Sequence, residues 1–87
     1  MTLTQLKYVL AIAKAGTINA AAKQLFISQP TLSSAVKELE AELGISLFNR
    51  TSKGVEPTAD GEEFLSYARQ VVMQTDLIEE RYLGTAR

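Results

Sequence analysis

Cysteine and histidine are both missing from this 87-residue chain. Without cysteine there is no disulfide scaffold, no thiolate metal site and no cysteine nucleophile. Without histidine the chain lacks the commonest general base and the commonest metal ligand, so neither a hydrolytic triad nor a zinc centre is expected. We therefore expect no catalytic residues, no metal and no cofactor, and the composition favours a binding module over an enzyme.

Long apolar runs are also missing. No segment approaches the roughly 20 residues that cross a bilayer, and the N-terminus has no signal-peptide pattern. We expect a cytoplasmic protein without a membrane partner. The residues that are present, 46% hydrophobic and 22% charged, have the composition of one small folded domain.

An excess of positive charge is the third absence. The net charge is −1 and the isoelectric point is about 5.3, whereas DNA-binding domains often exceed about 9. The charges are unevenly distributed, because residues 1–59 carry six basic and four acidic side chains and residues 60–87 carry three basic and six acidic ones. This asymmetry fits two segments with different roles, although a short chain can also reach it by chance.

Apolar residues spaced by three and four predict four helices over about 4–14, 17–25, 28–43 and 58–83. The start and stop signals are N-caps at Thr17, at Ser28 and at Thr58 or Asp60, and terminal glycines at Gly16 and Gly44. Between the last two, residues 45–48 fit a short strand or a packed connector, and 49–54 are polar and turn-rich.

Residues 55–58 fit the returning strand of a hairpin, in which Pro57 must occupy an edge. This order predicts a mainly α fold: a winged helix-turn-helix over 1–58, followed by a linker or dimerisation helix over 59–87. A plain helical bundle, with 45–58 as an irregular loop, is the alternative.

The side chains in the N-terminal half of the third predicted helix are small and neutral, and many of them carry hydroxyl groups. Its amide, on Gln29, can read adenine through paired donor and acceptor contacts, and the free N–H groups of a helix start attract phosphate. On a helical wheel Lys37 shares the face of Pro30 and Ser34, while three carboxylates lie in the later half of the helix: Glu38, Glu40 and Glu42. Such residues are also common as plain caps and solvated positions, and for Ser28 alone capping is the preferred interpretation.

Apolar side chains recur by four and three along the last predicted helix, as in a coiled-coil seam. A body this small cannot bury them, so we expect a homodimer. The seam residues are Phe64, Ala68, Val71, Thr75, Ile78 and Tyr82. A second hypothesis, from a different class, is a helical protein-interaction module that does not bind DNA.

Two stretches closely resemble the DNA-binding domain of LysR-type transcriptional regulators: AAAKQLFISQPTLS over 20–33 and LEAELGISLFNR over 39–50. The resemblance implies a third helix in the major groove, a wing on the adjacent backbone or minor groove, and a long helix that dimerises. It also implies double-stranded palindromic operator DNA as partner, and a small-molecule effector bound only by a C-terminal domain that this chain lacks. The chain is then an isolated domain of a longer regulator, which can form tetramers, or a short protein without effector sensing.

Carried over by position, the resemblance assigns DNA contacts to the third helix and the wing, and the helical wheel adds Lys37. The complete set is Ser28, Gln29, Pro30, Thr31, Ser33, Ser34, Lys37, Arg50 and Lys53. The sequence departs from the family pattern at Ser34, where many members carry arginine, and at Pro57, where many carry a hydrophobic residue. The first departure removes a strong contact to DNA, and the second affects the outgoing strand of the wing.

Overall fold

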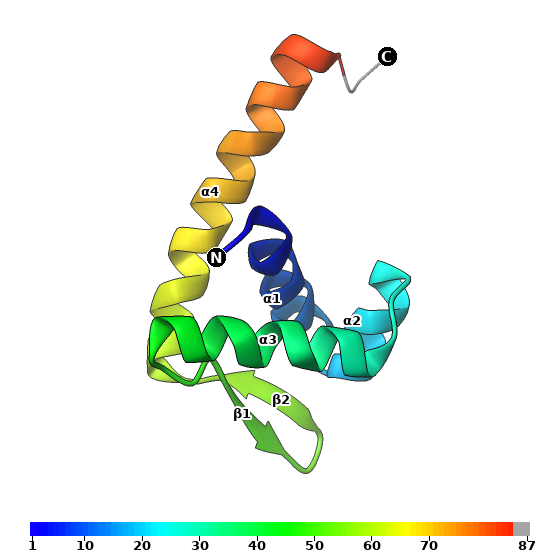
Figure 1. The fold of residues 1–87 in the computed structure, drawn as a ribbon, viewed down its shortest axis with the longest axis vertical. Helices are drawn as coiled ribbons and strands as arrows, with labels where there is room; N and C mark the ends of the chain where they lie inside the picture. The colour runs from blue at the N-terminus through cyan, green and yellow to red at the C-terminus, as the bar shows by residue number, and fades with distance from the viewer. Residues whose placement is uncertain (85–87) are drawn as a thin grey trace.

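The computed structural model describes residues 1–84; residues 85–87, which end the segment predicted over 59–87, lie outside the described residues. Within 1–84 the order is α1 (Leu3–Ala15), α2 (Ile18–Leu25), α3 (Gln29–Leu43), β1 (Phe48–Thr51), β2 (Gly54–Pro57) and α4 (Ala59–Leu83). In Figure 1, α1 to α3 form a body, the hairpin lies beneath α3, and α4 extends away from them. The winged helix-turn-helix prediction is confirmed, and the alternative of an irregular loop over 45–58 is wrong.

Side-chain caps fix where the helices begin. The hydroxyl of Thr17 accepts a hydrogen bond from the backbone N–H of Ala20 (3.0 Å), as its predicted capping role requires. α1 begins earlier than predicted because Thr2 and Gln5 form a reciprocal capping box. α1 and α3 end as predicted, at glycines with positive φ.

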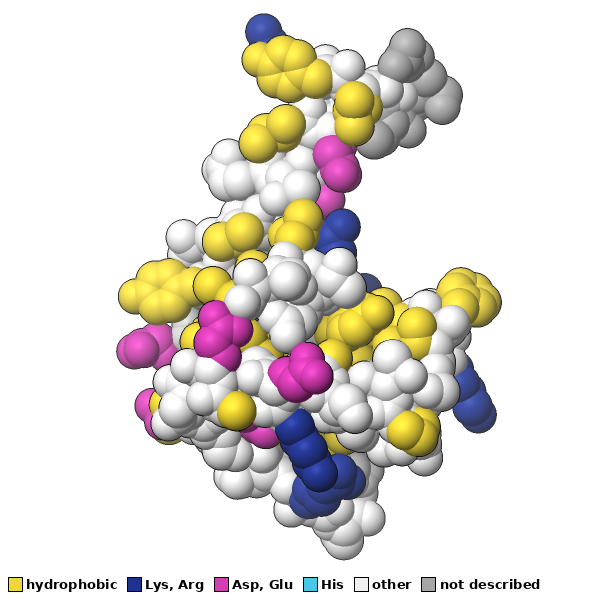
Figure 2. Space-filling view, in the orientation of Figure 1, with side chains coloured by type: hydrophobic (Ala, Val, Ile, Leu, Met, Phe, Trp, Pro, Cys, Tyr) yellow, Lys and Arg dark blue, Asp and Glu magenta, His cyan; other side chains and the backbone are white. Residues whose placement is uncertain are grey.

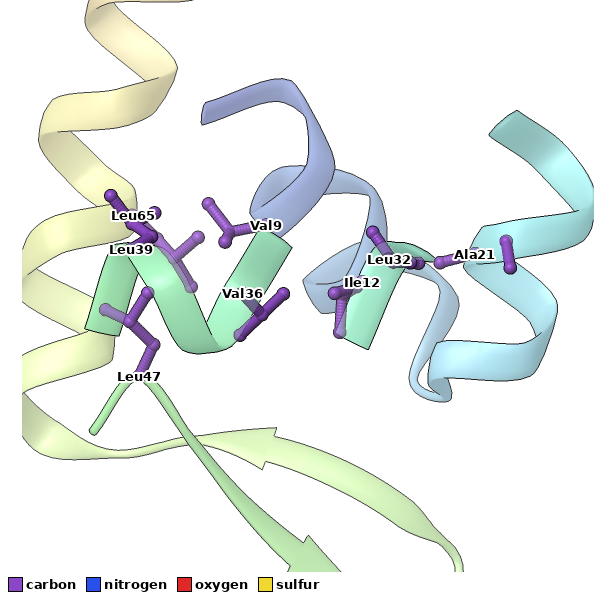
Figure 3. Packing of buried hydrophobic residues seen from close by; sticks show 9 residues of the cluster. Val9, Ile12, Ala21, Leu32, Val36, Leu39, Leu47 and Leu65 are labelled. Carbon is purple, nitrogen blue, oxygen red and sulfur yellow. The ribbon is translucent and has the colours of Figure 1, made fainter. Parts of the chain in front are cut away.

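The core lies between α1, α3 and the start of α4, as the facing side chains in Figure 3 show. Each element contributes one apolar stripe, and the fully buried members include Ile12 of α1 and Leu32 and Leu39 of α3. α2 contributes the small side chains of Ala21 and Ala22, which allow α1 and α3 to approach it closely. The stripes follow the helical period that the sequence pattern predicted.

The connector between α3 and the hairpin is anchored through the backbone of Leu47, whose side chain is fully buried. Its N–H donates to Oε2 of Glu40 on α3 (2.7 Å), and its carbonyl accepts from the N–H of Thr58 (3.0 Å). The Thr58 hydroxyl donates to the Ser46 carbonyl (2.5 Å) and accepts from the Gly61 N–H, which caps α4. One short segment therefore links α3, the start of α4 and the hairpin of β1 and β2, which is the wing of this fold.

The hairpin pairs Phe48 with Pro57 and Thr51 with Gly54 in antiparallel register. β1 extends over positions predicted as turn, because its polar side chains are exposed on both faces and give no alternating signal. Pro57 fits as expected, since both strands of a two-stranded sheet are edges. The wing also touches the α1–α2 turn, where the Val55 N–H donates to the Gly16 carbonyl (2.9 Å).

α4 divides into a packed beginning and an exposed continuation. Gly61, Leu65 and Ala68 are buried, whereas Val71 and Ile78 are exposed. The later turns extend beyond the body (Figure 1), and several of their apolar side chains are exposed among the described residues 1–84. No helix within residues 1–84 combines the length and apolarity needed to cross a membrane.

Replacing Gly61 with alanine tests the contact between α4 and the connector. A Cβ at this position would collide with the Leu47 carbonyl. In an ordinary helix the change gains about 1 kcal/mol, but overpacking costs about 1–3 kcal/mol, so we expect Gly61→Ala to lower the free energy of unfolding. Urea denaturation measures it, with exposed Gln70→Ala as control, expected to change stability by no more than about 0.5 kcal/mol. A stabilised Gly61→Ala variant would contradict this packing.

Candidate nucleic-acid interface

The start of α3 is held by two hydroxyl groups that contact each other. Ser28 Oγ accepts from the backbone N–H of Thr31 (3.2 Å) and lies 2.7 Å from Thr31 Oγ1. Pro30 occupies the first turn, where its missing N–H leaves no helical hydrogen bond unmade. The capping role of Ser28 is confirmed. The hydroxyl groups of Ser28 and Thr31 are already hydrogen-bonded to each other before another molecule binds.

α3 presents two polar faces, which the structure separates. Ser33 and Lys37 line a groove against the wing together with Arg50, and Gln29 lines the neighbouring groove, again with Arg50. Pro30, Thr31 and Ser34 line a shallow hollow on the outer face. The candidates on α3 thus form a wing-side group, which extends to Lys37 in the middle of the helix, and an outer group near its start. The helical wheel placed Lys37 with Pro30 and Ser34, and this placement is wrong because Lys37 faces the wing.

The basic residues of this surface have no acidic partner within residues 1–84. Lys37, Arg50 and Lys53 are exposed, and none of them belongs to an ion pair. Figure 2 shows basic side chains gathered between α3 and the hairpin, with acidic side chains adjoining them on α3. Lys37 and Arg50, which line one groove without an ion pair, favour an anionic ligand there.

The three carboxylates of α3 have different surroundings. Glu40 lines the wing-side groove, but its Oε2 accepts from the connector N–H of Leu47. Glu42 binds the Met1 ammonium at 2.7 Å. Glu38 is exposed and lines the outer hollow beside Thr31 and Ser34, so it lies closer to the candidate contacts than its place in the helix indicated.

The sequence pattern did not identify every residue of the grooves. Asn19, Thr17 and Thr51 line the same groove as Gln29 and Arg50. The start of α2 reaches the hairpin because the wing binds the α1–α2 turn, a contact between distant parts of the chain. The one available signal in the sequence was the N-cap at Thr17, which predicts that a helix begins there. That signal does not show that the hairpin and Gln29 lie opposite the start of α2.

The predicted seam on α4 is only partly available to a partner. Ala68 is 2% exposed in the single chain, so it is buried in its own domain; its assignment to the seam is corrected accordingly. Phe64 packs against the core, and Thr75 is half-buried. Val71, Ile78 and Tyr82 are exposed, and Tyr67, which the pattern missed, is 62% exposed beside them.

Three helices, a hairpin packed beside the third, and grooves that carry an amide, hydroxyls and cations define a winged helix-turn-helix DNA-binding domain. The profile of the lysR family of bacterial regulatory helix-turn-helix proteins matches residues 3–62. The chain belongs to the LysR family. This membership favours DNA binding over the interaction module, and a regulator over an enzyme.

Curated relatives and solved structures agree with this assignment. The whole chain is 42% identical to the regulator ClcR of Pseudomonas putida and 43% identical to AlsR of Bacillus subtilis, covering 30% and 29% of their lengths. The chain thus spans less than a third of these relatives. The DNA-binding domain of CbnR in complex with DNA superposes over 100% of both chains with a TM-score of 0.88 and 41% identity. That of BenM with benA site 1 DNA gives 0.90 and 35%, covering 99% of this chain and 97% of that one.

Two substitutions at Ser28 separate capping from contact with DNA. Ser28→Ala removes the cap and is expected to cost about 0.5–2 kcal/mol of stability, whereas Ser28→Asp keeps a capping oxygen and stays close to the unmodified chain. The aspartate also brings a negative charge to the proposed phosphate site, so its affinity for duplex DNA should fall. Thermal unfolding and fluorescence anisotropy measure the two effects. Equal stability of all three proteins would contradict the capping role.

Proposed function

We propose that this domain binds operator DNA as a homodimer and thereby regulates transcription. The N-terminal half of α3 enters the major groove, and the wing contacts the adjacent backbone or minor groove. The observation that carries the proposal is the position of Arg50, which lines both wing-side grooves with the polar face of α3. The DNA contacts are Ser28, Gln29, Pro30, Thr31, Ser33, Ser34, Lys37, Arg50 and Lys53.

These contacts divide into reading and anchoring groups. Gln29 supplies the amide geometry that matches an adenine edge in the major groove. Lys37, Arg50 and Lys53 neutralise phosphates, which position the protein and carry little sequence information. The hydroxyls of the outer face, on Thr31 and Ser34, contact phosphate or base edges without adding charge. The complexes of CbnR and BenM DNA-binding domains with DNA, at 35–41% identity, support DNA binding by this domain.

The dimer forms through an exposed apolar stripe on α4, the α4 stripe, made of Tyr67, Val71, Ile78 and Tyr82. These residues span about 60° of the helix circumference at 100° per residue. Their spacing is symmetric, because Tyr67 and Tyr82, like Val71 and Ile78, lie equally far from the midpoint between residues 74 and 75. A stripe of this kind matches a second, antiparallel copy of itself across a twofold axis.

The proposal places the domain in a larger regulator of the cytoplasm. Residues 1–58 form the DNA-binding unit, and the later turns of the segment 59–87 link it to an effector-binding domain and to the second protomer. A small molecule bound by that effector domain then controls activation or repression, and a tetramer forms in the full-length protein. The relatives, which are more than three times as long as this chain, support this arrangement.

Alanine substitutions at Gln29 and Arg50 test the division between reading and anchoring. The reference DNA is the best duplex that the unmodified chain selects from a randomised library, compared with a scrambled duplex of the same composition. Gln29→Ala should cost roughly 1–3 kcal/mol on the selected duplex and much less on the scrambled one. Arg50→Ala should weaken both by a similar factor. Anisotropy titrations at fixed salt measure the four affinities.

Arg69→Ala is the matched control, because this exposed arginine lies between α4 and α1, with Lys14 rather than with the wing. It should leave both affinities unchanged. Equal losses on the two duplexes with Gln29→Ala would contradict its reading role, and a large loss with Arg69→Ala would move the DNA surface to α1 and α4.

Two adjacent apolar residues of α4 test the dimer. Ile78 lies on the α4 stripe and is 59% exposed, whereas Leu77 is 52% exposed but lies about 100° away around the helix. Each dimer buries two copies of Ile78, each worth about 1.5–3 kcal/mol, so Ile78→Asp should weaken dimerisation by at least about 100-fold. Leu77→Asp should leave the dimer intact. Sedimentation equilibrium distinguishes the outcomes, and an unmodified chain that stays monomeric at micromolar concentration would refute the dimer.

A further inference from the structure

The amide of Gln29 is already held by its own helix. Its Nε2 donates a hydrogen bond to Oγ of Ser33, one turn further along α3, at 2.8 Å. Both side chains are half-buried on the wing side of the helix. The long glutamine side chain is therefore ordered before DNA arrives, which removes part of the entropy cost of ordering it on binding.

This hydrogen bond limits which hydrogen bonds the Gln29 amide can still form with a base. A free glutamine amide has two N–H donors and one carbonyl acceptor. With one N–H engaged by Ser33, one donor and one acceptor remain, which is the pair that the major-groove edge of adenine requires. Guanine presents two acceptors at its major-groove edge, so reading it with a bidentate pair needs two donors.

The hydrogen-bonded pair of Gln29 and Ser33 lies on the wing side of α3, apart from the polar groups of the outer hollow. Ser33 lines the groove of Lys37 and Arg50, and Gln29 lines the adjoining one with Arg50 and Asn19. The nearby Ser34 belongs to the outer hollow instead and makes no hydrogen bond with Gln29. Although the two serines are adjacent in sequence, only Ser33 contacts the Gln29 amide.

We propose that Ser33 is a positioning residue that makes Gln29 select adenine over guanine. Ser33 acts through the Gln29 amide: it occupies one donor and fixes the direction of the remaining donor and acceptor. The inference rests on the proposed function, since it concerns the base pair that Gln29 reads. It assigns to Ser33 a role in specificity that direct contact with DNA does not supply.

The test compares adenine with guanine at one base pair of the selected duplex, the pair at which Gln29→Ala loses discrimination. The unmodified chain should prefer adenine by roughly 5- to 100-fold, as expected for a good bidentate contact. Ser33→Thr and Ser33→Val have nearly the same shape and are both β-branched, so they differ chiefly in the hydroxyl. We expect Ser33→Thr to keep the preference for adenine and Ser33→Val to reduce it to within about threefold.

Two further measurements distinguish positioning from direct contact. In a Gln29→Ala background, Ser33→Val should cause no additional loss of the adenine preference, because the partner of the hydroxyl is gone. Ser34→Ala should change the affinity for both duplexes by one common factor and leave the adenine-to-guanine ratio as it was. Circular dichroism confirms that each variant remains helical.

Each outcome bears on a different claim. A full preference retained by Ser33→Val, additive losses in the Gln29→Ala background, or a selected guanine would overturn the role of Ser33 while DNA binding stands. Equal affinity of the unmodified chain for selected and scrambled duplexes would instead overturn the proposed function itself.

Discussion

The anchoring of Leu47 is the constraint on which the rest of this structure depends. Its backbone binds Glu40 on one side and Thr58 on the other, and its carbonyl packs so closely on α4 that only glycine fits at position 61. A buried N–H or carbonyl without a partner costs about 1–3 kcal/mol, so these bonds strongly disfavour other arrangements of the connector. Because the hairpin begins at the next residue, the same contacts determine how the wing lies beside α3.

The position of the wing explains how an acidic chain presents a surface for a polyanion. Lys37 comes from the middle of α3 and Arg50 from β1, and they share a groove only because the hairpin is held against the helix. The competing carboxylate in that groove, Glu40, is bound to the connector. Net charge describes the whole chain, whereas the DNA surface that we propose is a local one on which cations and neutral donors predominate.

Local signals in the sequence predicted the parts of this fold that depend on neighbouring residues. The caps at Thr17, Ser28 and Thr58 and the terminal glycines gave the helix boundaries within a few residues, because capping involves residues three positions apart. The resemblance over 20–33 and 39–50 supplied the family and with it the candidate contacts. Those assignments to DNA contacts remain predictions.

Features that join distant residues could not be predicted in this way. Polar side chains concealed β1, which is a strand because β2 pairs with it. The heptad pattern included Ala68 and missed Tyr67, because periodicity alone cannot say which side of α4 the body covers. The links from Glu40 to Leu47 and from Gln29 to Ser33 depend on which rotamers the packed structure allows.

The claim that α3 and the wing form one DNA surface is tested most directly by nuclear magnetic resonance. Adding the selected duplex to the 15N-labelled chain should shift the backbone amides of residues 28–37 and 49–55 together, at the same DNA concentration. The amides around Lys14 and Arg69, between α1 and α4, should stay nearly unchanged. Shifts centred on α1 and α4, with α3 and the hairpin unaffected, would contradict the account.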